Sequence, residues 1–213
     1  MQLTFIGSSM TKRNKSCESE VMLTMQRKEL LKKSAIRHAE YYGMVEVQDA
    51  LYADSANKKI FTDLISIIGS DANIKMAYRN LKSNKGSNTP GVDGKTFKDL
   101  AEMSEEALVR CVRDKILNYQ PKAVRRVYIP KPNGKMRPLG IPTVIDRIVQ
   151  QSVLQVMEPI CEAKFYRHSY GFRPNRSTKN AVAVCYKLAQ VDGFHYVVDV
   201  DIKGFFDNVD HGK

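Results

Sequence analysis

Close to the end of the 213-residue chain lies the segment Tyr196-Val197-Val198-Asp199-Val200-Asp201-Ile202-Lys203-Gly204-Phe205-Phe206-Asp207. Its β-branched residues favour a strand, in which successive side chains point to opposite faces. Asp199 and Asp201 then share one face, and the aliphatic residues between them share the other. Carboxylates in such an apolar strand lose their hydration. This loss costs free energy unless a cation or a hydrogen bond compensates for it. We therefore expect a buried strand that presents Asp201 near its end.

Magnesium is the cation that this segment favours, because Mg²⁺ prefers hard oxygen ligands and takes few carboxylates from the protein. Asp201 is the candidate ligand, since it is the carboxylate nearer the strand end. The alternative is that both acids lie on an exposed edge strand or cap the next turn, and the segment alone does not decide between these. Phe205 is expected in the core. Phe206 is close enough to Asp201 to contact the sugar of a nucleotide, where a rigid ring would exclude a 2′-hydroxyl.

The basic segment 121–140 is predicted to form a β-hairpin. Residues 123–129 and 135–141 have strand composition, and the Asn-Gly pair between them favours a tight turn. The segment holds six Lys and Arg and no acid. Guanidinium groups bind phosphate oxygens in pairs and lysine adds a point charge, so the hairpin is predicted to bind a triphosphate or a template backbone. A solvated basic hairpin without a ligand is the alternative. Alternation places Arg126 and Arg125 on opposite faces.

A second basic segment, 164–179, holds five Lys and Arg and again no acid. Here aromatic residues alternate with arginines, a composition that stacks bases and binds the backbone of RNA. Packing within the loop explains Tyr170 and Phe172 equally well. Arg173 and Arg176 are predicted RNA contacts, because core packing does not require a guanidinium group. The net charge of +11 also suits a polyanionic partner.

Apolar residues at helical spacing, preceded by capping residues, predict four helices that start near Asp71, Ser104, Thr143 and Thr178. Thr143 and Asp146 have the spacing of a capping box, and Pro159 is expected to end the third helix. The first helix runs into a basic loop over 83–94 with three glycines and a proline. Residues 1–60 are predicted to be an extension of unknown role, with a helix over 21–33. This order of elements indicates an α+β fold.

Composition excludes several classes of protein. A hydrophobic content of 43% argues against global disorder. The four cysteines are scattered without a C-x-x-C pair, so neither a zinc site nor a disulfide framework is predicted. No apolar stretch reaches the length of a membrane span, and the first residues lack the charge order of a secretory signal. A cytoplasmic protein without a membrane partner is expected.

Taken together, the motifs resemble the reverse transcriptases encoded by bacterial group II introns, also called maturases. The resemblance covers about 71–213 and rests on Arg125 to Thr143, Asp146-Arg147, Gln150-Gln151, Tyr170-Gly171-Phe172-Arg173-Pro174 and Asp199 to Asp207, in that order. It implies a right-hand polymerase fold to which this chain contributes the fingers subdomain and the first strand of the palm, behind a helix-rich N-terminal extension. The implied parts are the helical start of the fingers at 61–120, with a template loop at 83–94, the remaining fingers at 121–194, and the start of the palm at 195–213.

The resemblance also assigns roles to particular residues. Asp201 matches the first catalytic aspartate and a Mg²⁺ ligand, and the backbone carbonyl of Ile202 helps to hold the metal. Phe206 matches the aromatic residue that excludes ribose. The incoming nucleotide is expected to contact Arg125, Lys131 and Arg137. RNA or template contacts are expected from Lys82, Lys85, Arg126, Lys135, Arg173 and Arg176.

The implied function is RNA-directed DNA synthesis, together with binding of intron RNA to assist splicing and retrohoming. The implied partners are intron RNA, an RNA template with its DNA primer, and deoxynucleoside triphosphates. Bacterial origin is implied, and a homodimer is left open. The paired-aspartate motif of the family is absent from the 213 residues. Two-metal phosphoryl transfer needs carboxylates on both metals, so this chain alone is predicted to be inactive, as a truncation, a proteolytic product or a degenerate gene would be. The alternative is a non-catalytic module that docks on structured intron RNA. An unrelated phosphotransferase would need a second acidic cluster, and retroelement enzymes with the same palm are minor alternatives.

Overall fold

The computed structural model describes residues 35–130, 132, 134–202 and 205. The chain forms two compact units, of which the first ends at Lys164 and the second begins at Phe165. The helix predicted over 21–33 lies outside the described residues. In the described ranges, no helix is both long and apolar enough to cross a membrane.

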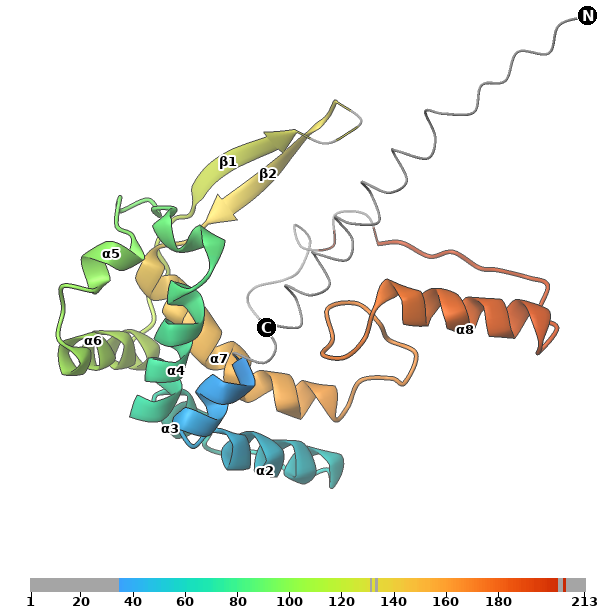
Figure 1. Cartoon of the computed structure of the whole chain (residues 1–213), viewed down its shortest axis with the longest axis horizontal. Helices are drawn as coiled ribbons and strands as arrows, with labels where there is room; N and C mark the ends of the chain where they lie inside the picture. Colours follow the sequence, from blue (N-terminus) through green and yellow to red (C-terminus); the bar gives the residue numbers. More distant parts are fainter. Residues whose placement is uncertain (1–34, 131, 133, 203–204, 206–213) are drawn as a thin grey trace, which may run out of the picture. The chain divides into compact units, whose positions relative to one another are not determined.

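The first unit is a group of helices from which one hairpin extends (Figure 1). Residues 35–41 are helical, and the elements that follow are α2 (Val45–Ala56), α3 (Leu64–Ile68), α4 (Asp71–Lys82), a 3₁₀ turn η1 (Lys85–Asn88), α5 (Phe97–Leu100), α6 (Glu105–Leu117), β1 (Arg125–Pro130), β2 (Met136–Ile141) and α7 (Val144–Glu162). Helix α7 is central, because α2, α3, α4 and α6 all pack against it. A mixed fold with a small antiparallel sheet is therefore confirmed, while the division into fingers and palm stays a prediction.

The helices start where their capping residues predict. Ser70, Ser104 and Thr143 each accept a hydrogen bond from a backbone N–H in the first turn of the following helix. Helix α4 buries Ile74 and Ala77 against α6 and α7, as its spacing predicts. On helix α7, Leu154 is 50% exposed, whereas the polar Gln155 beside it is buried.

A hydrogen-bonded polar group lies between α4 and α7. Asn73 is fully buried, and its side-chain amide donates to the carbonyls of Ile68 at 2.9 Å and Ser152 at 3.0 Å. The amide of Gln155 donates in turn to Oδ1 of Asn73 at 2.7 Å. Asn80 donates to Oε1 of Gln155 at 3.0 Å. These paired amides fix how the two helices align, because shifting one would leave buried polar atoms without partners.

Helix α7 continues through Pro159 to Glu162, so the prediction that the proline ends the helix is wrong. A proline removes the N–H that would bond to the carbonyl four residues earlier, here that of Gln155. The side-chain amide of Gln48 on α2 donates to this carbonyl at 3.1 Å. The lost backbone bond is thus replaced from another helix, and the last turn of α7 persists.

The second unit contains α8 (Thr178–Gln190), which starts after its predicted cap, Ser177. None of the residues of α8 is buried. The strand predicted near the end of the chain is wrong for 196–202, which form no strand and are exposed, with Val197 94% exposed. A strand needs hydrogen bonds from a neighbour, and within the described residues the two strands pair only with each other.

Candidate nucleic-acid interface

The register of the hairpin sorts its basic residues onto two faces. Arg125 lies opposite Ile141, and Ile129 lies opposite Arg137. Opposed residues of an antiparallel pair project to the same side, so Arg125 and Arg137 share a face. They are offset by four residues, about 13 Å at the rise of a strand. Arg126 projects to the other face, with Tyr128. The alternation predicted from the sequence is confirmed.

Both faces of the hairpin are open to solvent beyond its base. Tyr128 is 59% exposed on one face, while Ile129 and Leu139 are 45% and 41% exposed on the other. Lys135 lies just before β2, at the turn of the hairpin. Lys131 lies outside the described residues. The exposed ribbon thus offers one face with Arg125 and Arg137, and an opposite face with Arg126.

The base of the hairpin is attached to the loop over 83–94. Arg125 is half-buried, and its Nε donates to the carbonyl of Pro90 at 3.0 Å. Gly91 lies against the start of α7, where an added Cβ would stand 2.6 Å from Cα of Thr143. Only glycine fits this close approach of two backbones. The loop is therefore held between the hairpin and the start of α7.

Arg147 fixes the same loop from α7. Its guanidinium group donates to the carbonyls of Pro142 at 3.1 Å, Gly86 at 3.0 Å and Thr89 at 2.7 Å. Burial lowers the pKa of Arg147, and the nearby Arg125 lowers it further, while Asp93 raises it. The sequence named Arg147 only as part of a motif and gave it no role. Its signal in the sequence was only its place one residue after a capping pair.

The lysines predicted to bind template lie at the ends of short elements around this loop. Lys82 is the last residue of α4, and its Nζ lies 5.6 Å from the centre of the Tyr78 ring. Lys85 is exposed and opens the 3₁₀ turn. Both are near the segment that Arg147 and Arg125 hold, so the loop presents its cations from an anchored backbone.

A mixed-charge hollow lies beside the start of α7. It is lined by Asp93, Asp114 and Asp146, by Lys95, Lys115 and Lys122, and by apolar residues. Asp146 is 2% exposed, and its Oδ2 accepts from the Thr143 hydroxyl at 2.7 Å. Burial and the charge of Asp146 raise the pKa of Tyr119 nearby. In the part of the chain that the structure describes, no group of three or more His, Cys, Asp and Glu could hold a metal ion.

The arginines predicted to bind RNA in the second unit are engaged with their own loop. Arg173 is 9% exposed and donates to the carbonyls of Tyr166 at 2.9 Å and Ser169 at 3.0 Å. Arg176 donates to the carbonyl of Arg167 at 2.9 Å. Their guanidinium groups also lie 5.1 Å from the Phe165 ring and 5.6 Å from the Tyr170 ring. Both residues hold the loop together, and their contact with RNA stays a prediction.

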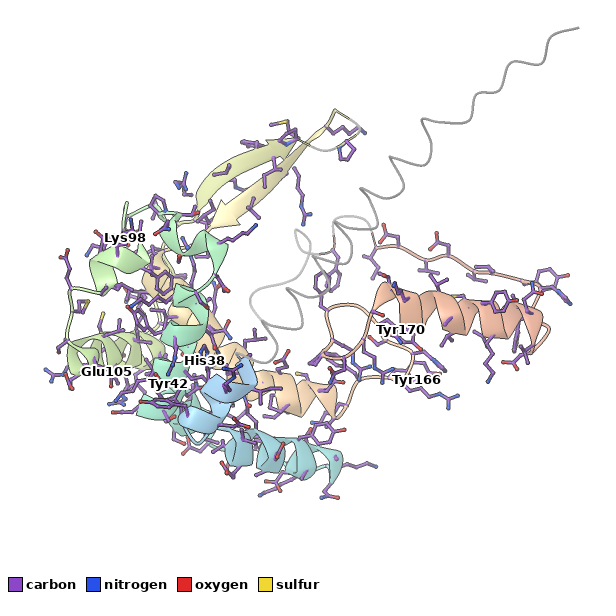
Figure 2. All side chains as sticks on the ribbon, viewed as in Figure 1. His38, Tyr42, Lys98, Glu105, Tyr166 and Tyr170 are labelled. Atoms are coloured by element: carbon purple, nitrogen blue, oxygen red, sulfur yellow. The ribbon has the colours of Figure 1, made fainter. Side chains whose placement is uncertain are left out.

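The aromatic residues of this loop divide into a row of three neighbouring rings and one separate ring. Tyr166, His168 and Tyr170 form a row, with ring centres 5.4 Å and 6.4 Å apart along it. Figure 2 labels Tyr166 and Tyr170 on the loop that precedes α8. Packing does not explain Phe172, which is fully exposed and has a φ of 55°.

Asp201 and Ile202 lie in the exposed segment after α8. Asp201 belongs to the second unit and the hairpin to the first, so their approach to one another stays a prediction. Phe206 lies outside the described residues. The carboxylate and the carbonyl of these two residues are hard oxygen donors of the kind that Mg²⁺ prefers, and they would form one part of a ligand set.

Comparisons with known proteins agree on one family. The family model described as "Reverse transcriptase (RNA-dependent DNA polymerase)" matches residues 129–213. The group II intron-encoded protein LtrA of Lactococcus lactis is 42% identical over 137 residues, which is 64% of this chain. The chain contains part of a reverse transcriptase domain and is similar to the group II intron-encoded proteins.

Two further relatives agree with this similarity. Protein YkfC of Escherichia coli is 45% identical over 141 residues, or 63% of the chain. A putative COX1/OXI3 intron 1 protein of Saccharomyces cerevisiae is 31% identical over 169 residues, or 76% of the chain. The matched regions cover 36% of YkfC, 22% of LtrA and 19% of the yeast protein. The chain thus spans about a third or less of these relatives.

Proposed function

We propose that this chain forms the nucleotide- and template-binding front of an RNA-directed DNA polymerase that also binds the RNA of its own intron. On this proposal, Arg125, Lys131 and Arg137 contact the incoming triphosphate. The template is contacted by Arg126, Lys135, Lys82 and Lys85. The second unit then presents Asp201 as the first catalytic aspartate and Phe206 as the ring that excludes ribose.

The two-faced hairpin is the observation that carries this proposal. Two roles for one short ribbon require cations on both sides, and the register provides Arg125 and Arg137 on one face and Arg126 on the other. A segment with six basic residues and no acid also attracts phosphates to both sides. Similarity to the reverse transcriptase family gives these cations their expected ligands.

Magnesium fits the donor chemistry of Asp201 and the carbonyl of Ile202, although a single carboxylate is an incomplete set. When bound, the metal would neutralise charge on the phosphates during nucleotide transfer. The residues of this chain would meanwhile orient the triphosphate through Arg125 and Arg137 and keep the template in register through Arg126.

Binding to a single-stranded RNA of 20 nucleotides, followed by fluorescence anisotropy over a series of salt concentrations, tests the hairpin. Replacing Arg126 and Lys135 together by Gln removes two of the proposed template contacts. The slope of log K against log salt should therefore decrease by about 1.4, since each contact on a single strand contributes about 0.7. The matched control is Lys98→Gln with Arg110→Gln, two exposed cations on α5 and α6. Equal slopes for the two double variants would contradict the proposal.

We further propose that the 213 residues bind RNA without copying it. Purified chain with a primed RNA template, deoxynucleoside triphosphates and Mg²⁺ should show no extension of the primer, while the same preparation binds the template. Templated extension by this chain would contradict the incomplete ligand set, and loss of RNA binding would contradict the proposal as a whole.

A further inference from the structure

Phe172 combines two properties that are rarely found together in a folded chain. Its side chain is fully exposed, yet the loop around it is held firmly by Arg173, which follows it directly. A large apolar side chain that remains in water contributes nothing to the stability of its own loop. The ring is therefore available to a ligand from a well-anchored position.

The surroundings of this ring favour one kind of ligand. The segment 164–179 contains five basic residues and no acid, so the local charge attracts a polyanion. Two of these basic residues, Arg173 and Arg176, donate N–H groups to backbone carbonyls of the loop. Tyr166 is a second exposed ring of the loop, at 69%. Exposed rings within a field of positive charge are how proteins bind unpaired bases.

We infer that Phe172 is a base-stacking residue for single-stranded RNA, with the arginines of the loop acting as supports rather than as the principal contacts. This inference rests on the proposed function, since it names the chemistry by which the second unit holds RNA. It differs from the sequence-based prediction. There, Arg173 and Arg176 were the RNA contacts, and packing within the loop explained Phe172 as well as base stacking did. The stacked base would lie on the ring face, and the charge around it would hold the phosphates on either side.

Two variants of the whole chain test this inference. Phe172→Ala removes no contact with the described residues, so folding should be unchanged, as circular dichroism and thermal unfolding would show. Its affinity for single-stranded RNA should fall roughly 5- to 150-fold, the range for loss of one stacked base. The slope of log K against log salt should stay the same, because no phosphate contact is lost. Ile60→Ala is the matched control, since Ile60 is an apolar side chain 84% exposed in the first unit.

Phe172→Trp gives a direct readout, because the chain contains no other tryptophan. This variant should keep the affinity of the native chain. Its fluorescence should be quenched by the RNA but not by heparin, a polyanion without bases. Either an unchanged affinity for Phe172→Ala or equal quenching by heparin would overturn the inference. So would a loss of affinity together with a smaller salt slope, which would indicate a damaged phosphate site. Failure of the native chain to bind RNA would contradict the proposed function itself, and not only the role of Phe172.

Discussion

At the scale of single residues, arginines hold loops together in this chain. Arg125, Arg147 and Arg173 each donate to backbone carbonyls of a loop with little regular structure. Loop carbonyls need donors when they are removed from water, and an arginine carries five N–H groups in a rigid fork. Counting basic residues in a segment therefore overstates how many are available to a nucleic acid. This distinction could not be read from the sequence, because the carbonyls lie up to 61 positions away.

Arg147 gives a prediction at this scale. Arg147→Lys keeps the charge but cannot reach the carbonyls of Pro142, Gly86 and Thr89 at once, since lysine has a single nitrogen. The loop over 83–94 should open more readily, by about 1 to 3 kcal/mol in local free energy. Hydrogen exchange of the loop amides would measure this. Arg110→Lys, on the exposed side of α6, should leave their exchange unchanged; equal exchange in both variants would show that Arg147 does not anchor the loop.

Asn73 gives a second prediction. Asn73→Asp is almost the same size, but it places an oxygen against the carbonyls of Ile68 and Ser152, where the native amide donates. The free energy of unfolding at pH 7 should decrease by about 3 kcal/mol or more, because buried acceptors lose their donor and a charge is buried. Urea unfolding would measure it. Gln150→Glu makes the same chemical change at an exposed position of α7 and should cost far less. Similar losses in both variants would argue against the polar group between α4 and α7.

At the scale of elements, the sequence predicts what local patterns determine. Caps, apolar spacing and the Asn-Gly turn give α4, α6, α7, α8 and the hairpin, all of which are confirmed. Helix α2 was missed, because its buried side is a narrow stripe of Leu51 and Ser55 in an otherwise polar stretch. The end of α7 was misplaced because the donor that replaces the missing N–H of Pro159 is on α2, 107 residues from Gln155.

The prediction of a strand near the end of the chain was wrong for a related reason. Composition measures how well a segment suits a sheet, but a strand forms only beside a partner. Residues 196–202 have the composition without a partner among the described residues. In the candidate site, too, some features could be predicted from the sequence and others could not. The two faces of the hairpin followed from alternation alone, whereas the roles of Arg147 and Phe172 depend on contacts, or on a lack of packing, that only coordinates reveal.

At the scale of the whole molecule, the two units differ in how much they bury. The first unit has apolar groups around α7, such as Ile74, Val112 and Ile148, each fully buried. Helix α8 of the second unit buries none of its residues, and Val182 and Tyr186 are both 67% exposed. Helices gain most of their stability from packing an apolar face. The two units should therefore differ in stability within one chain.

Hydrogen exchange of the whole chain, followed by mass spectrometry, tests this difference. Amides in the middle of α7 should exchange only through global unfolding, and those of α8 through local opening at a lower free energy. A low concentration of urea should therefore accelerate exchange in α7 while changing α8 little, since local opening exposes little new surface. Equal protection of both helices would contradict this division.

The register of β1 and β2 has a consequence for how the chain tolerates insertions and deletions. Neighbouring side chains on a strand point in opposite directions, so one extra residue within β1 would carry Arg125 and Arg126 each to the side that the other occupied. A lengthened turn would leave both strands as they are. Natural variants of this protein should therefore differ in length at the hairpin tip and keep the strands at constant length, because a single codon added to a strand would exchange the surfaces assigned to nucleotide and template.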